Sequence, residues 1–120
     1  PVRVARMREV MFYLASTMHV NHAHKRRGAR WASNPASFKD MTRKVPETMA
    51  ASCEYICNHG LRGPFVLGDS LSLADCYLHV ISTWLEGDGV KLAGFPKLQA
   101  FMEAMEARDS VKAVRAKDML

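Results

Sequence analysis

The sequence predicts an all-α fold, a bundle of about five helices, and three observations lead to it. Apolar residues recur at spacings of three and four along most of the chain, as they do on the buried face of a helix. Glycine and proline interrupt this pattern, and no segment alternates apolar and polar residues as a half-buried strand does. The 120 residues, 48% of them hydrophobic, suffice for one domain with a core.

The first helix is predicted from about residue 3 to residue 27. Its apolar residues are spaced four, three and four apart, which places them on one buried stripe: Met7, Met11, Leu14 and Met18. Gly28 is the expected stop of this helix.

The second helix follows a turn at Asn34-Pro35. Its stripe comprises Met41, Val45, Met49, Cys53 and Ile56. Because Pro46 lies within the stripe and cannot donate an intrahelical hydrogen bond, the helix is predicted either to begin near Pro46 or to be kinked there. Gly60 is its expected end.

The third helix carries the clearest local signal, the segment Ser72-Leu-Ala-Asp75. The Ser72 hydroxyl can accept from the amide of Asp75, and the Asp75 carboxylate can accept from the amide of Ser72. This structural capping box predicts a helix to about Glu86 and gives neither residue a catalytic role. The residues expected to be buried are Leu73, Cys76, Tyr77, Val80, Ile81 and Trp84.

Two shorter helices complete the predicted bundle. Phe95-Pro96 opens the fourth, since proline is favoured in the first turn of a helix. Its expected core face is Leu98, Phe101, Met102 and Met105. The fifth helix is predicted after Asp109, over residues 110 to 116.

The chain lacks the features of a membrane or secreted protein. No apolar run approaches the roughly 20 residues that a transmembrane helix needs, and the first residues have no signal-peptide stretch. Three cysteines, an odd number, indicate reduced thiols rather than disulfides. Cys53 and Cys57, one helical turn apart, are interpreted as small apolar residues of a buried face. We therefore expect a cytoplasmic protein.

The net charge of +5 lies in the first half of the chain. Its densest cluster is Lys25-Arg26-Arg27 with Arg30, followed by Trp31. One such cluster, without a recognisable nucleic-acid-binding motif, does not indicate a nucleic-acid partner. Two interpretations remain: a solvated helix end, where cations suit the helix dipole, or a basic surface that attracts an anionic ligand.

A series of motifs then points to a known family. Residues 63–69, Gly-Pro-Phe-Val-Leu-Gly-Asp, run into the capped helix with its Ala-Asp-x-Tyr-Leu, and Trp84 lies two turns further on. Phe-Pro-x-Leu at 95–98 and Ala-Arg-Asp-Ser-Val at 107–111 follow. This series resembles the C-terminal helical domain of glutathione S-transferases. Residues 13–19, Tyr-Leu-Ala-Ser-Thr-Met-His, resemble the opening helix of that domain in bacterial, beta-class-like members.

The resemblance covers nearly the whole chain, and residues 22–44 match least well. At Asp109, family members commonly have proline after the arginine. The resemblance implies one helical domain over residues 1–120. It also implies a preceding thioredoxin-like domain that binds glutathione and activates its thiol, and no βαβ pattern here encodes one. We therefore expect a fragment or a stand-alone module, inactive by itself.

Candidate site residues lie on a second face of the first helix. Phe12, Ser16 and His19 are spaced four and three apart, well away from the methionine stripe. The resemblance implies that Ser16 and His19 line the cleft where the electrophile meets the glutathione sulfur and that Trp84 closes it. Phe12 and Trp84 would be apolar walls. The resemblance also implies that basic groups near this cleft would attract anionic glutathione or an acidic substrate. The alternative is that His19 is a surface histidine and that Trp84 fills the core.

A metal site is not expected. His19 and His22 could face one ion from adjacent turns, but His24 points elsewhere on a continuous helix. No carboxylate or cysteine lies near them in the sequence to complete a ligand set.

The leading hypothesis is the C-terminal domain of a cytoplasmic, homodimeric glutathione transferase active in detoxification. The intact enzyme would use glutathione as co-substrate, attack an apolar electrophile and need no metal. The alternative is a non-catalytic helical protein-interaction module whose basic half meets an acidic partner. Neither hypothesis involves nucleic acid or a membrane.

Overall fold

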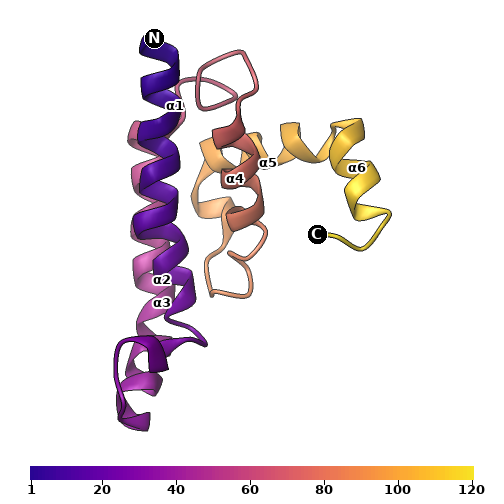
Figure 1. The fold of residues 1–120 in the computed structure, drawn as a ribbon. Helices are drawn as coiled ribbons and strands as arrows, with labels where there is room; N and C mark the ends of the chain where they lie inside the picture. The colour runs from indigo at the N-terminus through magenta and orange to yellow at the C-terminus, as the bar shows by residue number, and fades with distance from the viewer.

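The computed structural model describes all 120 residues and consists of helices joined by turns, with no β-sheet (Figure 1). The α-helices form five segments when α1 and α2, which are continuous through a wider turn, are counted together. The predicted all-α bundle of about five helices is therefore confirmed. No helix combines the length and the apolar content that a bilayer span requires.

The first segment comprises α1 (Val2–Tyr13), a π-helical turn (Leu14–Met18) and α2 (His19–Ala23). Leu14 and Met18 are fully buried, and Met7 and Met11 are partly buried, so the predicted stripe faces the core. The segment ends about four residues earlier than predicted. Tighter hydrogen bonds, such as Lys25 N to His22 O at 3.0 Å, close its last turn before a short 3-10 helix, Gly28–Arg30.

Helix α3 (Pro35–Tyr55) lies beside α1 (Figure 1). It starts at Pro35 because the Asn34 side chain accepts a hydrogen bond from Ala36 N at 2.9 Å. The helix therefore does not begin near Pro46, which it includes. A π-helical turn, Ile56–Gly60, ends the segment where predicted. The stacked rings of Tyr13 and Tyr55, with centroids 3.9 Å apart, connect α3 to α1.

Helix α4 (Leu73–Ser82) begins with the capping box that the sequence indicates. The Asp75 carboxylate accepts hydrogen bonds from the Ser72 amide at 2.7 Å and the Ser72 hydroxyl at 3.0 Å. Its other oxygen accepts from Val66 N at 2.8 Å. The fully buried Asp75 therefore joins the preceding connector to the helix as well as capping it.

The buried face of α4 differs from the predicted one. Ile81 is buried as expected, but Leu73, Cys76 and Val80 are exposed, and Tyr77 and Trp84 are only partly buried. The residues that pack inward instead are Ala74, Asp75, Leu78, His79, Ile81 and Ser82. Asp75 and His79 occupy this face because each has a hydrogen-bond partner there. The helix ends at Ser82, and turns replace its expected continuation to Glu86.

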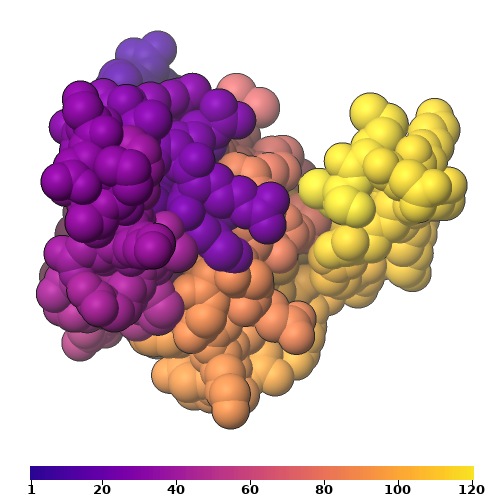
Figure 2. Space-filling model, turned by 90° about the horizontal axis from the view of Figure 1, so that it is seen from below, coloured from indigo at the N-terminus to yellow at the C-terminus, as the bar shows by residue number.

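Helices α5 (Pro96–Glu106) and α6 (Asp109–Arg115) complete the chain. All four residues predicted for the core face of α5 are buried. Helix α6 projects from the main body, where the yellow residues of Figure 2 stand apart from the rest. The radius of gyration, 15.0 Å, accordingly exceeds the roughly 13 to 14 Å of a compact chain of this length.

Candidate functional site

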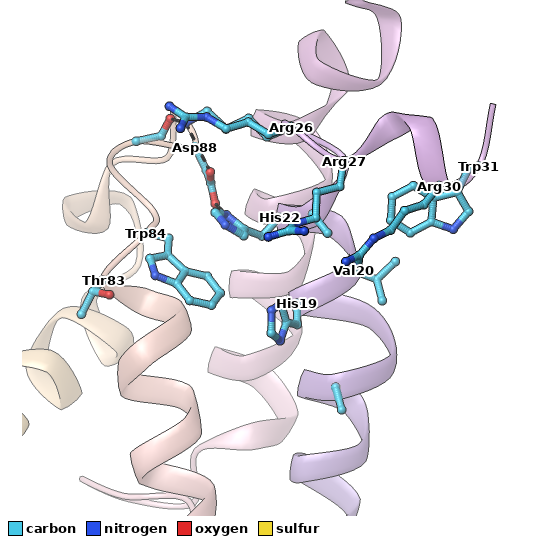
Figure 3. Close-up of a pocket in the computed structure, with 14 residues that line it drawn as sticks. His19, Val20, His22, Arg26, Arg27, Arg30, Trp31, Thr83, Trp84 and Asp88 are labelled. Carbon is cyan, nitrogen blue, oxygen red and sulfur yellow. Dashed lines mark hydrogen bonds and ion pairs between the residues drawn. The ribbon is translucent and has the colours of Figure 1, made fainter. Parts of the chain in front are cut away.

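A cavity lies between the end of the first helical segment and the turn after α4. Its volume is about 940 Å³, near the upper end for small-molecule sites. One wall carries His19, His22 and the basic residues after α2, and the other carries Trp84 and Asp88 (Figure 3). In Figure 2 the violet residues of the first wall adjoin the orange residues that follow α4.

His19 and Trp84, which the sequence analysis placed in one site, do meet in this cavity. Their ring centroids are 5.2 Å apart. The Nδ1 atom of His19 lies 2.8 Å from the hydroxyl of Tyr77, a residue of α4 that precedes Trp84 by about two helical turns. Tyr77 therefore fixes the orientation of the His19 ring and was not among the predicted site residues.

The protonation states of His19 and Tyr77 define the hydrogen bond between them. Desolvation lowers the pKa of His19, and the neighbouring His22 lowers it further. Desolvation also raises the pKa of Tyr77. Both groups are therefore neutral near pH 7. When the Tyr77 hydroxyl donates to Nδ1, the Nε2–H of His19 remains free to donate to a ligand.

His22 is held by a buried carboxylate. Its Nδ1 lies 2.6 Å from Oδ2 of Asp88, whose side chain is fully buried. Lys25 Nζ lies 3.6 Å from the other Asp88 oxygen and also donates to the carbonyl of Gly87. The His22 ring stacks on Trp84 with centroids 4.3 Å apart. Asp88 thus positions a histidine, a lysine and, through His22, the indole of Trp84.

The basic cluster of the sequence forms one side of the same cavity. Its lining residues are Lys25, Arg26, Arg27, Arg30 and Trp31. The indole of Trp31 stacks on the imidazole of His24 with centroids 4.0 Å apart and an interplanar angle of 10°. Arg26, Arg27 and Arg30 are exposed where they border the cavity, so a solvated helix end and a surface for an anionic ligand both fit the structure.

Phe12 and Ser16 do not line the cavity. The side chain of Phe12 is 71% exposed, and the Ser16 hydroxyl donates to the carbonyl oxygen of Phe12 at 2.6 Å. Both lie on the same helix face as His19: Ser16 is about one turn before it, and Phe12 is about two turns before it. Their predicted contact with substrate remains a prediction.

The three histidines of the first segment have separate partners. His19 bonds to Tyr77 and His22 to Asp88, and His24 Nδ1 lies 2.7 Å from the carbonyl oxygen of Val20. No group of three histidine, cysteine or acidic side chains is arranged to bind a metal ion. Cys53 is buried, which raises the pKa of its thiol to about 12.

Comparisons with known proteins agree with this architecture. The family model described as "Glutathione S-transferase, C-terminal domain" matches residues 29–118. No curated protein matches the sequence. A solved structure of a glutathione transferase homologue from Sulfitobacter, with bound glutathione, is 57% identical and superposes with a TM-score of 0.98. The superposition covers 100% of this chain and 58% of the homologue.

A second solved structure, a ternary complex of the bacterial glutathione transferase BphK, shares the fold alone. It is 24% identical, with a TM-score of 0.77 over 95% of this chain and 54% of its own. The chain thus spans little more than half the length of the two proteins it superposes on. With the match over residues 29–118 and the 57% identity, this chain belongs to the glutathione S-transferase family and has the fold of its C-terminal domain.

Proposed function

We propose that this chain is the C-terminal domain of a glutathione transferase and that its cavity is part of the electrophile site. The observation that carries the proposal is that His19, held by Tyr77, and Trp84 line one cavity, in a chain 57% identical to a homologue with bound glutathione. The preceding thioredoxin-like domain would bind glutathione. The helical domain of residues 1–120 would supply the opposite wall of the cleft.

In the intact enzyme the sulfur of glutathione attacks the electrophilic carbon of the substrate. With an aryl halide, a carbon–sulfur bond forms, the carbon–halogen bond breaks and halide leaves, while the thiol proton passes to solvent. The neutral His19, held by Tyr77, donates from Nε2 to glutathione or to the substrate, and Trp84 provides a flat apolar wall. Phe12 and Ser16 would extend this wall toward the thioredoxin-like domain.

The exposed apolar face of α4 supports a covering domain. Leu73, Cys76 and Val80 are three, four and seven residues apart, so they share one face, and all three are exposed. Leu73 is 64% exposed and Phe12 of α1 is 71% exposed. A thioredoxin-like domain packed on this side would bury them. The intact protein would be a cytoplasmic homodimer that acts in detoxification, and the chain alone would be inactive.

The test is glutathione conjugation to chlorodinitrobenzene by the complete gene product. We expect His19→Ala to reduce the rate about tenfold, the value of one hydrogen bond to a charged group. His59→Ala is the matched control, because His59 is exposed and lies outside the cavity. Equal rates for the wild type and His19→Ala would remove His19 from the site.

A complete gene product without a thioredoxin-like segment, and without conjugating activity, would contradict the enzyme. It would favour the alternative, a non-catalytic helical protein-interaction module whose basic half meets an acidic partner. Activity of the isolated domain would overturn the expectation that it is inactive alone.

A further inference from the structure

We propose that the cavity selects an aromatic substrate that carries a carboxylate, and that Arg26, Arg27 and Arg30 bind this group. The inference rests on the proposed function, because it names the substrate class of the same site. It assigns the basic residues to an acidic group of the substrate, where the leading hypothesis expected an apolar electrophile. Three features of the cavity support it: its charge, the absence of internal partners for its arginines, and its fixed aromatic surfaces.

The charge of the cavity is strongly positive. Four cationic side chains line it, namely Lys25, Arg26, Arg27 and Arg30, against the single carboxylate of Asp88. Asp88 is fully buried and already contacts His22 and Lys25, so it neutralises neither the arginines nor a ligand. Three positive charges remain without compensation. A cavity of one sign attracts the opposite charge, and it does so more strongly than open surface does.

The side chains of Arg26, Arg27 and Arg30 have no hydrogen-bond or ion-pair partner within the chain. Arg6, Arg43 and Arg115 each pair with a carboxylate on the same or a neighbouring helix, whereas the side chains of Arg8, Arg62 and Arg108 have no such partner either. No such partner is available locally here, because residues 10 to 39 contain neither aspartate nor glutamate. Their guanidinium groups are therefore free to bind a carboxylate, which they can hold through two parallel hydrogen bonds.

The aromatic surfaces are held in place on both sides of the basic residues. Trp84 stacks on His22, which Asp88 anchors, and Trp31 stacks on His24. Figure 3 shows the two indoles at opposite sides of the site, with Arg27 between them. A substrate ring packed on Trp84 beside His19 would direct a ring substituent toward the arginines. The site thus provides a surface for a flat ring and cations for its acidic group.

A solvated helix end would also explain basic residues after α2, but it predicts no preference between a charged and an uncharged ligand. The test is therefore the affinity of the complete gene product, with glutathione present, for dinitrobenzoate and for its uncharged isostere dinitrobenzamide. Calorimetric titration measures both without a chemical step. The probes differ in the acidic group alone.

Two triple variants complete the experiment. The first replaces Arg26, Arg27 and Arg30 by glutamine. The second replaces Lys39, Arg43 and Lys44 by glutamine. These three residues are exposed on α3 and lie outside the cavity, and their replacement changes the net charge as much as the first variant does. Circular dichroism establishes that each variant is folded.

We expect the wild type and the α3 variant to bind dinitrobenzoate about tenfold more tightly than dinitrobenzamide. The cavity variant should lose this preference and keep its affinity for the amide. Equal affinity of the wild type for both probes would overturn the inference, whether or not the variants fold. An unchanged preference in the cavity variant would overturn it too. A carboxylate preference without any glutathione conjugation would contradict the proposed function and leave the anion site standing.

Discussion

His22 and Asp88 are 66 residues apart in the sequence, and their Nδ1 and Oδ2 atoms lie 2.6 Å apart in the fold. Asp88 sits in the turn after α4, and its side chain is fully buried. The pair closes one end of the cavity and joins the first helical segment to that turn. Because Lys25 approaches the same carboxylate, the contact serves both stability and the position of the cavity wall.

The first prediction concerns this buried carboxylate. Asp88→Ala should lower the free energy of unfolding by about 2 kcal/mol, because His22 loses its hydrogen-bond partner and Lys25 loses its ion-pair partner, a fully buried carboxylate. Urea unfolding measures the change. Asp40→Ala is the matched control, since Asp40 pairs with Arg43 on the exposed surface of α3 and should change stability by less than about 1 kcal/mol. Similar losses for both variants would contradict a special role for Asp88.

The second prediction separates the two residues of the capping box. Sequence reasoning assigns about 1 kcal/mol to Asp75→Ala, the value of a lost cap. In the structure Asp75 also accepts from Val66 N, so its removal leaves a buried amide without a partner. We expect Asp75→Ala to cost about 3 kcal/mol and Ser72→Ala about 1 kcal/mol in thermal or urea unfolding. Equal costs would mean that the Val66 hydrogen bond contributes nothing.

The third prediction is a pH dependence of stability. Hydrogen bonds from Arg115 and His79 lower the pKa of Glu106 to about 2, below its ordinary value of 4.5. A carboxyl group with a lowered folded-state pKa stabilises the fold fully above its unfolded-state pKa. It loses that contribution as the pH falls toward the folded-state pKa. The stability advantage of the wild type over Glu106→Gln should therefore shrink between about pH 5 and about pH 2.

Urea unfolding of both proteins across this range measures the effect. Glu103→Gln is the control, because Glu103 is exposed on the same helix and its only side-chain contact is with Gln99 at 3.4 Å. A difference between the wild type and Glu106→Gln that stays constant with pH would show that the pKa of Glu106 is not lowered.

The fourth prediction concerns the protonation of His19. Desolvation, followed by the charge of His22, lowers its pKa below the ordinary 6.5, so the ring should titrate in the acidic range in an NMR-detected pH series. His19 is already exposed in part, and Trp84→Ala removes a neighbouring ring that desolvates it, so this change should raise that pKa toward 6.5. Trp31→Ala should leave it unchanged, because Trp31 stacks on His24 instead. A His19 titration at or above the ordinary value would refute the assignment.

Local sequence signals were sufficient wherever the structure depends on neighbours in the chain. The capping box at Ser72, the start of α5 at Pro96 and the buried stripe ending in Met18 all depend on residues within a few turns. The sequence left open whether α3 begins near Pro46 or includes it, and the structure shows a helix that starts at Pro35, after the Asn34 cap, and includes Pro46. The buried face of α4 was not predicted either. Its polar residues Asp75 and His79 face inward with partners that come from other parts of the chain.

By itself the sequence determined the all-α class, most helix boundaries, the capping box and the motifs of the glutathione S-transferase family. Only the tertiary structure brought His22 to Asp88, Tyr77 to His19, and the arginines after α2 to the same cavity as Trp84. The physical reason is the range of the interactions. Helical periodicity and capping act between residues one turn apart, whereas a cavity is formed by side chains that the folded backbone brings together from distant parts of the chain.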